Sequence, residues 1–258
     1  MKLQLLSDLH LESETFEPEP APGAEVLVLA GDIDSTWQGL TRFAGWPVPV
    51  LLVPGNHEFD GRDIHQGLAQ LSTLTQGLGI RLLYRDSCVL TDAQGVAVRW
   101  VGATRWSDFD LFGAAGRARA MRAGRYFADV MRAERHGRPF DAEAVREEGL
   151  LCRAYLEQAL REPADGRWQR TVVITHFAPS LLSADPRYGA APGTASFCSA
   201  DDDLIPQADL WLHGHLHCRH HYRVPRSDGS ATPVVCQARG LAHKGEDLGL
   251  EPLRVWEV

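Results

Sequence analysis

The chain has 258 residues, of which 44% are hydrophobic and 23% are charged. This composition is ordinary for a folded globular protein, and the length suits one large α/β domain or a core with one sizeable insertion. The formal net charge of −8 argues against a protein whose main role is non-specific binding to nucleic acid or to an anionic membrane. We therefore expect a single domain over residues 1–258.

The cysteines and the N-terminal residues indicate a cytoplasmic protein. The five cysteines are odd in number and include no CxxC pair, which argues against a disulfide framework and fits a reducing compartment. The apolar run 3–6 is too short for the core of a signal peptide. No run reaches the roughly 18 apolar residues of a membrane span, so no membrane association is expected.

Five short apolar runs, each ending abruptly in polar residues, dominate the chain. They are residues 3–6, 26–30, 48–53, 172–175 and 210–212. Runs of Val, Leu and Ile without alternation predict strands that are buried on both faces. Helical patterns between them, such as 62–78, predict an α/β fold with a largely parallel or mixed sheet that is covered on both sides.

Residues 106–163 differ from the rest because they are rich in Arg, Ala and Glu and contain no long apolar run. One weakly apolar helical face is formed by Val145, Gly149, Cys152, Leu156 and Leu160. We interpret this segment as a helical insertion over or beside the functional site. The alternative is that these helices simply cover the sheet.

The C-terminal part of the chain contains short β-like segments. They span residues 221–224, 233–236 and 253–258. Asp228-Gly229 lies between the first two segments and predicts a hairpin turn there.

Metal-ligating residue types follow all five apolar runs. They are Asp8, His10, Asp32, Asn56, His176, His215 and His217. Ligands of α/β proteins gather beyond the carboxyl ends of the strands, so these side chains should share one site. We also expect each i, i+2 pair to reach that site because alternate residues of extended backbone face the same way. Aspartate can bridge two metals, and neutral imidazole suits Mn, Fe, Zn or Co better than Ca or Mg.

These residues occur in motifs that resemble the calcineurin-like metallophosphoesterase superfamily. The matching motifs are Asp8-Leu9-His10, Gly31-Asp32, Gly55-Asn56-His57-Glu58, His176 and Gly214-His215-Leu216-His217, in the order of that family. The resemblance implies an α/β fold, a four-layer αββα sandwich of two mixed sheets, with the helical insertion near the active site.

The resemblance also implies two divalent metal ions, with Mn, Fe or Zn expected. Asp8, His10 and His217 would hold the first metal, and Asn56, His176 and His215 would hold the second. Asp32 would bridge the two metals, and His57 would be a catalytic residue that binds neither.

The implied function is hydrolysis of phosphate mono- or diesters by attack of a metal-bridging hydroxide, with small molecules or nucleotides as the favoured substrates. His57 would protonate the leaving alkoxide or stabilise the charge that develops on it. The carboxylate that orients His57 is left open between the adjacent Glu58 and another residue such as Asp34. The family usually has Gly-Asp-x-x-Asp, but Asp34 stands one place early, so we interpret it as a cap of the following helix.

A cluster of arginines lies in the segment 106–163. It comprises Arg117, Arg119, Arg122, Arg125, Arg132, Arg135 and Arg138. One or two of them could bind a substrate phosphate, but we favour a solvated helix face. Residues 105–109 and 236–240 resemble signatures of small bacterial members of the superfamily.

Four functions compete for these motifs, and a small phosphorylated substrate is favoured because the chain is acidic and has no nucleic-acid-binding module. A nuclease acting on DNA or RNA should bind its substrate through the arginine cluster in a salt-sensitive way. Protein phosphatases of the superfamily carry arginines near the core motifs, where this chain has Ser35 and Glu58. A non-catalytic metal-binding scaffold would be expected to lose ligands or the catalytic histidine. The sequence does not indicate an oligomeric state.

Overall fold

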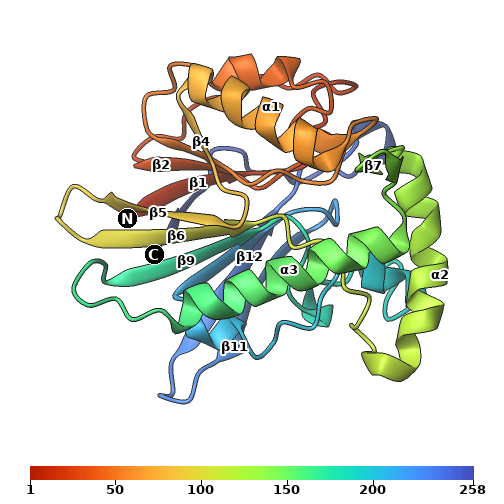
Figure 1. Cartoon of the computed structure of the whole chain (residues 1–258). Helices are drawn as coiled ribbons and strands as arrows, with labels where there is room; N and C mark the ends of the chain where they lie inside the picture. Colours follow the sequence, from red (N-terminus) through yellow and green to blue (C-terminus); the bar gives the residue numbers. More distant parts are fainter.

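The computed structural model describes residues 1–258 and places two mixed sheets face to face between helices (Figure 1). The five-stranded sheet has the order β13-β1-β2-β3-β4. Its parallel strands are β1 (Lys2–Leu6), β2 (Val26–Leu29), β3 (Val50–Leu52) and β4 (Ile80–Leu82). At its edge, β13 (Val255–Glu257) pairs antiparallel with β1 and brings the two ends of the chain together.

The six-stranded sheet has the order β11-β12-β10-β9-β6-β5. Its parallel strands are β6 (Ala97–Ala103), β9 (Arg170–Thr175), β10 (Leu210–His213) and β12 (Ala231–Gln237). The two edge strands, β5 (Asp86–Thr91) and β11 (Arg219–Pro225), pair antiparallel with their neighbours.

Three long helices and several 3-10 turns complete the chain. The long helices are α1 (Ile64–Leu78), α2 (Gly113–Met131) and α3 (Ala142–Arg161), and the small hairpin of β7 (Glu134–Arg135) and β8 (Arg138–Pro139) joins the last two. The 3-10 turns are η1 (Gln38–Phe43), η2 (His57–Phe59), η3 (Leu181–Ser183), η4 (Pro192–Ser196), η5 (Ile205–Gln207) and η6 (Ala242–Lys244). Asp63 caps α1 by accepting the backbone N–H groups of His65 and Gln66.

Three apolar layers hold these elements together. In β9, Val172 and Ile174 face the other sheet, whereas Val173 faces the helices. Leu5 and Val28 lie in the same inter-sheet layer. Because each central strand is covered on both faces, its sequence shows no alternation, and this is why the five runs read as continuous apolar segments.

The expected αββα architecture of two mixed sheets is confirmed. Helix α1 covers the outer face of the five-stranded sheet, and α3 covers the outer face of the six-stranded sheet (Figure 1). The five apolar runs form β1, β2, β3, β9 and β10, and Asp228-Gly229 lies in the β11–β12 turn. The β5–β6 hairpin was not expected, because Arg99 breaks the apolar sequence pattern of β6. In the fold Arg99 is buried, and its guanidinium donates to the carbonyl of Ala159 and the carboxylate of Glu162.

The segment 106–163 contains α2, the β7–β8 hairpin and α3. Helix α3 buries Cys152 and Leu156 in the layer on the outer face of the six-stranded sheet. Helix α2 instead packs beside η4, at the end of the molecule where the strand-end loops gather (Figure 1). The arginines of this segment either form ion pairs with nearby carboxylates or are exposed to solvent. Arg117, for example, forms an ion pair with Asp110.

No helix has the length and apolar character needed to cross a bilayer. All five cysteines are free.

A buried arginine joins the loop after β6 to the loop before η5. Arg105 is fully buried, and its guanidinium donates to Asp201 at 2.7 and 2.8 Å and to Asp108 at 2.7 Å. Because both carboxylates are also buried, removing the cation would leave Asp108 without an ion-pair partner and Asp201 with Arg153 alone.

We therefore expect Arg105→Met to lower the free energy of unfolding by about 3 kcal/mol or more. Urea denaturation followed by circular dichroism measures this change. Arg119→Met, on the surface of α2, is the matched control and should change stability by less than about 0.5 kcal/mol. Equal effects of the two substitutions would contradict a structural role for the buried cluster.

Candidate metal centre

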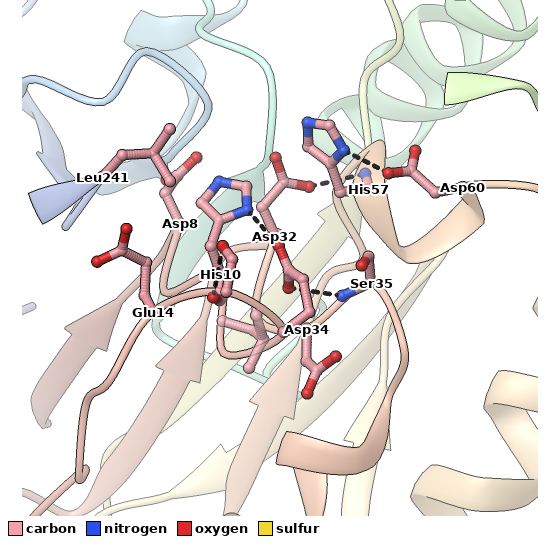
Figure 2. Close-up of polar contacts among 12 residues, drawn as sticks. Asp8, His10, Glu14, Asp32, Asp34, Ser35, His57, Asp60 and Leu241 are labelled. Atoms are coloured by element: carbon pink, nitrogen blue, oxygen red, sulfur yellow. Dashed lines mark hydrogen bonds and ion pairs between the residues drawn. The ribbon is translucent and has the colours of Figure 1, made fainter. Parts of the chain in front are cut away.

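The loops after five parallel strands meet at one end of the two sheets, and all the predicted site residues lie there. Asp8 and His10 follow β1, Asp32 follows β2, and Asn56 and His57 follow β3. From the other sheet, His176 follows β9, whereas His215 and His217 follow β10. Figure 2 shows Asp8, His10, Asp32 and His57 converging above the strand ends.

The donor atoms form two groups that could each hold a metal ion. Within each group, every donor atom lies within 4.8 Å of the others. The first group comprises Asp8, His10 and His217, and its two imidazole Nε2 atoms are 3.0 Å apart.

The second group comprises Asp32, His176 and His215. The Nε2 atom of His176 lies 3.2 Å from Asp32 Oδ2 and 3.1 Å from Asn56 Oδ1, so the amide of Asn56 joins this group. His215 packs against His176 with 4.8 Å between ring centroids. Burial lowers the pKa of His215, which favours the neutral imidazole that metals bind.

The backbone reaches this arrangement through left-handed residues and not through extended strand. The φ angles of Asp8, His10 and Asp32 are 54°, 48° and 53°, and those of His215 and His217 are 74° and 50°. The expectation that each i, i+2 pair lies on extended backbone was therefore wrong, although both pairs reach the centre. Left-handed conformations are uncommon outside glycine and gather at functional sites.

Small residues allow the loops to approach closely. A Cβ atom on Gly55 would lie 2.2 Å from Asp32 Oδ1, and one on Gly31 would lie 2.3 Å from His176 Nδ1. A Cβ atom on Gly214 would lie 2.7 Å from Asp8 Oδ2. The glycines of the motifs are therefore required by the packing of the donor groups.

Glu58 joins two of these loops through its buried carboxylate. Its oxygens accept the backbone N–H groups of Asp32 at 3.0 Å, Ile33 at 2.7 Å and Gly55 at 2.6 Å. Burial raises the pKa of Glu58 to about 7, against the effect of these donors. Glu58 is thus a structural residue that fixes the loops after β2 and β3, and it does not contact the His57 ring through a hydrogen bond.

Backbone and carboxylate acceptors orient the histidines of the donor groups. The Nδ1 atoms of His10 and His217 lie 3.0 Å from Glu12 and 2.7 Å from Glu246, respectively. An Nδ1–H group on each ring would direct the lone pairs of both Nε2 atoms toward each other, an arrangement that a cation between them stabilises. His176 Nδ1 lies 2.8 Å from the carbonyl of Ala30 in the same manner. The donor set therefore fits divalent metals.

Asp60 is the carboxylate that orients His57. Its Oδ2 atom lies 2.7 Å from His57 Nδ1 (Figure 2). Asp34 instead accepts the N–H groups of Thr36 and Gly39 at 2.6 Å each, so it caps the turn that leads into η1. Asp34 thus acts as the expected cap, although the element that follows is a 3-10 turn.

The donor groups open into a cavity of about 820 Å³. None of the arginines between 117 and 138 lines it, and its basic side chains are Arg187 and Lys244. Arg187 is committed to Asp185, with 2.8 Å between Nε and Oδ2, whereas Lys244 forms no ion pair. Sequence reasoning missed these residues as well as Glu12, Asp60 and Glu246, because only their folded position relates them to the centre.

Residues 3–219 match the sequence model of the calcineurin-like phosphoesterases. The chain belongs to this family. The resemblance inferred from the motifs is thereby confirmed, and the chain is a phosphate-ester hydrolase. The family uses a dimetal centre, in agreement with the two donor groups.

One solved structure agrees with the fold over the whole chain. A phosphopantetheinyl hydrolase from Mycobacterium tuberculosis is 18% identical, covers 100% of this chain and 95% of its own, and superposes with a TM-score of 0.72. Two other structures are more weakly similar. A dimetal phosphatase from Danio rerio is 13% identical, covers 91% of this chain and 86% of its own, and has a TM-score of 0.45. A calcineurin-like phosphoesterase from Bacillus subtilis is 13% identical, covers 92% of this chain and 80% of its own, and has a TM-score of 0.49. The search of curated proteins gave no match.

Replacing Glu58 with Ala should loosen the loops after β2 and β3. Three buried N–H groups would lose their acceptor, so the free energy of unfolding should fall by about 3 kcal/mol or more. Chemical denaturation measures the loss, and Glu143→Ala, on the surface of α3, is the control. A loss below about 1 kcal/mol would contradict the structural role of Glu58.

Proposed function

We propose that the protein hydrolyses phosphate mono- or diesters of small molecules or nucleotides with the help of two divalent cations. The observation that carries this proposal is that members of both donor groups line one cavity together with His57: His10 and His217 of the first group, and Asp32 and His215 of the second. Metal-assisted hydrolysis needs these parts within reach of a single phosphate group.

We assign Asp8, His10 and His217 to one cation and Asn56, His176 and His215 to the other. Asp32 would bridge them in this proposal: its buried carboxylate lies 3.2 Å from His176 Nε2 of the second group and also helps to raise the pKa of His10 in the first. Mn, Fe or Zn suits this mixture of carboxylate, amide and imidazole donors. When bound, the cations supply a deprotonated water for attack and neutralise the charge of the phosphoryl oxygens.

His57 is the proposed proton donor to the leaving group. Burial lowers its pKa, but the carboxylates of Asp32 and Asp60 outweigh burial and raise the pKa to about 10. The contact with Asp60, which binds neither cation in this proposal, favours the protonated ring. The contact of Nδ1 with Asp60 leaves Nε2–H as the group that can donate its proton to the leaving oxygen.

The cavity supports a small substrate over a nucleic acid. Its volume of about 820 Å³ falls in the range of pockets for small ligands, roughly 300–1,000 Å³. Lys244 adds an uncommitted positive charge to its wall, which suits an anionic ester. The arginine cluster, on which the nuclease alternative depended, does not line this cavity.

Activity should require metal and the proposed bridging carboxylate. We expect metal-stripped protein to be inactive on bis-p-nitrophenyl phosphate and p-nitrophenyl phosphate, and Mn, Fe or Zn to restore turnover. Asp32→Asn should lower kcat at least about a hundredfold because it weakens the link between the metals. Turnover that survives chelation, or that is unchanged in the variant, would contradict the proposal.

The same assay separates monoesterase from diesterase activity by the ratio of the two nitrophenyl esters. A phosphopantetheinyl diester belongs in the substrate panel, since the similar hydrolase from Mycobacterium tuberculosis is named for that group. Metal binding without turnover of any ester would favour the scaffold alternative.

His57→Ala should lower kcat by about 10²–10⁴ on alkyl phosphate esters, whose alkoxides need a proton. The loss should be much smaller on nitrophenyl esters, whose leaving groups do not. Asp60→Asn should show the same dependence on leaving group with a smaller loss, and the double variant should be no worse than His57→Ala. Metal content, measured by elemental analysis, should stay at the wild-type value; loss of metal in His57→Ala would make this residue a ligand.

A further inference from the structure

One wall of the cavity is apolar, although the centre itself is polar. Phe127 and Val130 of α2 line this part of the cavity. They are 38% and 51% exposed, although both are large apolar side chains on one face of the helix at i, i+3 spacing. Exposed apolar surface of this kind marks a place where a ligand or partner is bound.

Aromatic contacts connect the apolar wall to the donor groups. The ring of Phe127 lies 4.7 Å from that of Phe197, and the ring of Phe197 lies 4.9 Å from that of His215. A ligand that contacts the wall is therefore within reach of the second donor group.

Helix α2 is held in place by close packing, so the wall is a fixed part of the site. At Gly124 the helix approaches the loop after β6 and η4 so closely that a Cβ atom would lie 2.5 Å from the ring of Phe109 and 3.1 Å from Ser196 Oγ. At its end, the carbonyl of Met131 accepts the N–H group of Gly61 at 2.9 Å.

The last contact places the apolar wall on the His57 side of the centre. Gly61 directly follows Asp60, the residue that orients His57. Leu241, which precedes Lys244, lies at the opposite side, beyond Asp8 (Figure 2). In an in-line displacement the leaving oxygen faces the proton donor, so the leaving group and the apolar wall share one side of the cavity.

We propose that the leaving alcohol of the substrate carries an apolar chain or ring that binds against Phe127 and Val130, while the retained phosphate half faces Lys244. This inference rests on the proposed function and names its substrate class. Water forms the new bond to phosphorus, the bond to the leaving oxygen breaks, and His57 gives that oxygen its proton.

The direction of cleavage of an unsymmetrical diester tests this proposal. In phenyl 4-hexylphenyl phosphate the two phenols have nearly equal acidity, so the ratio of products reports which half occupies the leaving side. We expect 4-hexylphenol and phenyl phosphate in at least about tenfold excess over phenol and 4-hexylphenyl phosphate, because each buried methylene contributes up to roughly a fourfold preference. Phosphorus NMR resolves the two monoester products.

Variants of α2 identify the wall. Val130→Asn and Phe127→Asn should each lower the product ratio at least threefold, whereas their metal content, measured by elemental analysis, should stay at the wild-type value. Tyr126→Asn is the matched control, since Tyr126 is 68% exposed on the same helix but does not line the cavity. It should leave the ratio unchanged.

The outcomes separate this inference from the proposed function. A ratio near one, an excess of phenol, or no cleavage of the hexyl diester by protein that hydrolyses bis-p-nitrophenyl phosphate would overturn the apolar leaving-group site. Equal effects of Tyr126→Asn and Val130→Asn would also overturn it. Failure to hydrolyse bis-p-nitrophenyl phosphate with any added metal would instead count against the proposed function.

Discussion

The carboxylate of Glu58 holds together the two loops on which the centre is built. It accepts N–H groups from Asp32, Ile33 and Gly55, which belong to loops after neighbouring parallel strands. Backbone groups in these loops have no strand partner, and leaving them unpaired in a buried place is costly. One buried side chain thus satisfies the loops and sets the positions of Asp32 and Asn56.

The rest of the site follows from this close approach. Gly31 and Gly55 must lack side chains where the loops meet, and Asp32 takes a left-handed conformation that aims its carboxylate at His176. Such conformations are unfavourable by themselves and persist because the surrounding contacts determine them. The two sheets supply those contacts, since the inter-sheet layer fixes β2 and β9 relative to each other.

The sequence predicted the architecture and the members of the donor groups better than the geometry that relates them. Strand runs such as 172–175 are recognisable because burial on both faces leaves a continuous apolar pattern. The donor residues are recognisable because five strand ends carry metal-ligating types. The left-handed backbone at His10 and His217 could not be predicted from the motifs, because a motif specifies residue types and not backbone conformation.

Residues that act through contacts distant in sequence also escaped prediction. Glu246 meets His217 across 29 positions, and Lys244 joins the cavity through a C-terminal turn with no strand-end signal. The sequence alone does not decide between Glu58 and Asp34 as the partner of His57. The fold assigns them to backbone donors, and Asp60, one turn beyond His57, is the carboxylate that reaches the ring.

The most direct test of the dimetal centre is an electron paramagnetic resonance titration of metal-stripped protein with Mn²⁺. Two cations that share Asp32 as a bridge should give a spin-coupled multiline spectrum that is complete near two equivalents per chain. Asp32→Asn should lose this coupled signal. A six-line spectrum of isolated Mn²⁺ at two equivalents in the wild-type protein would contradict a bridged pair of metals in this cavity.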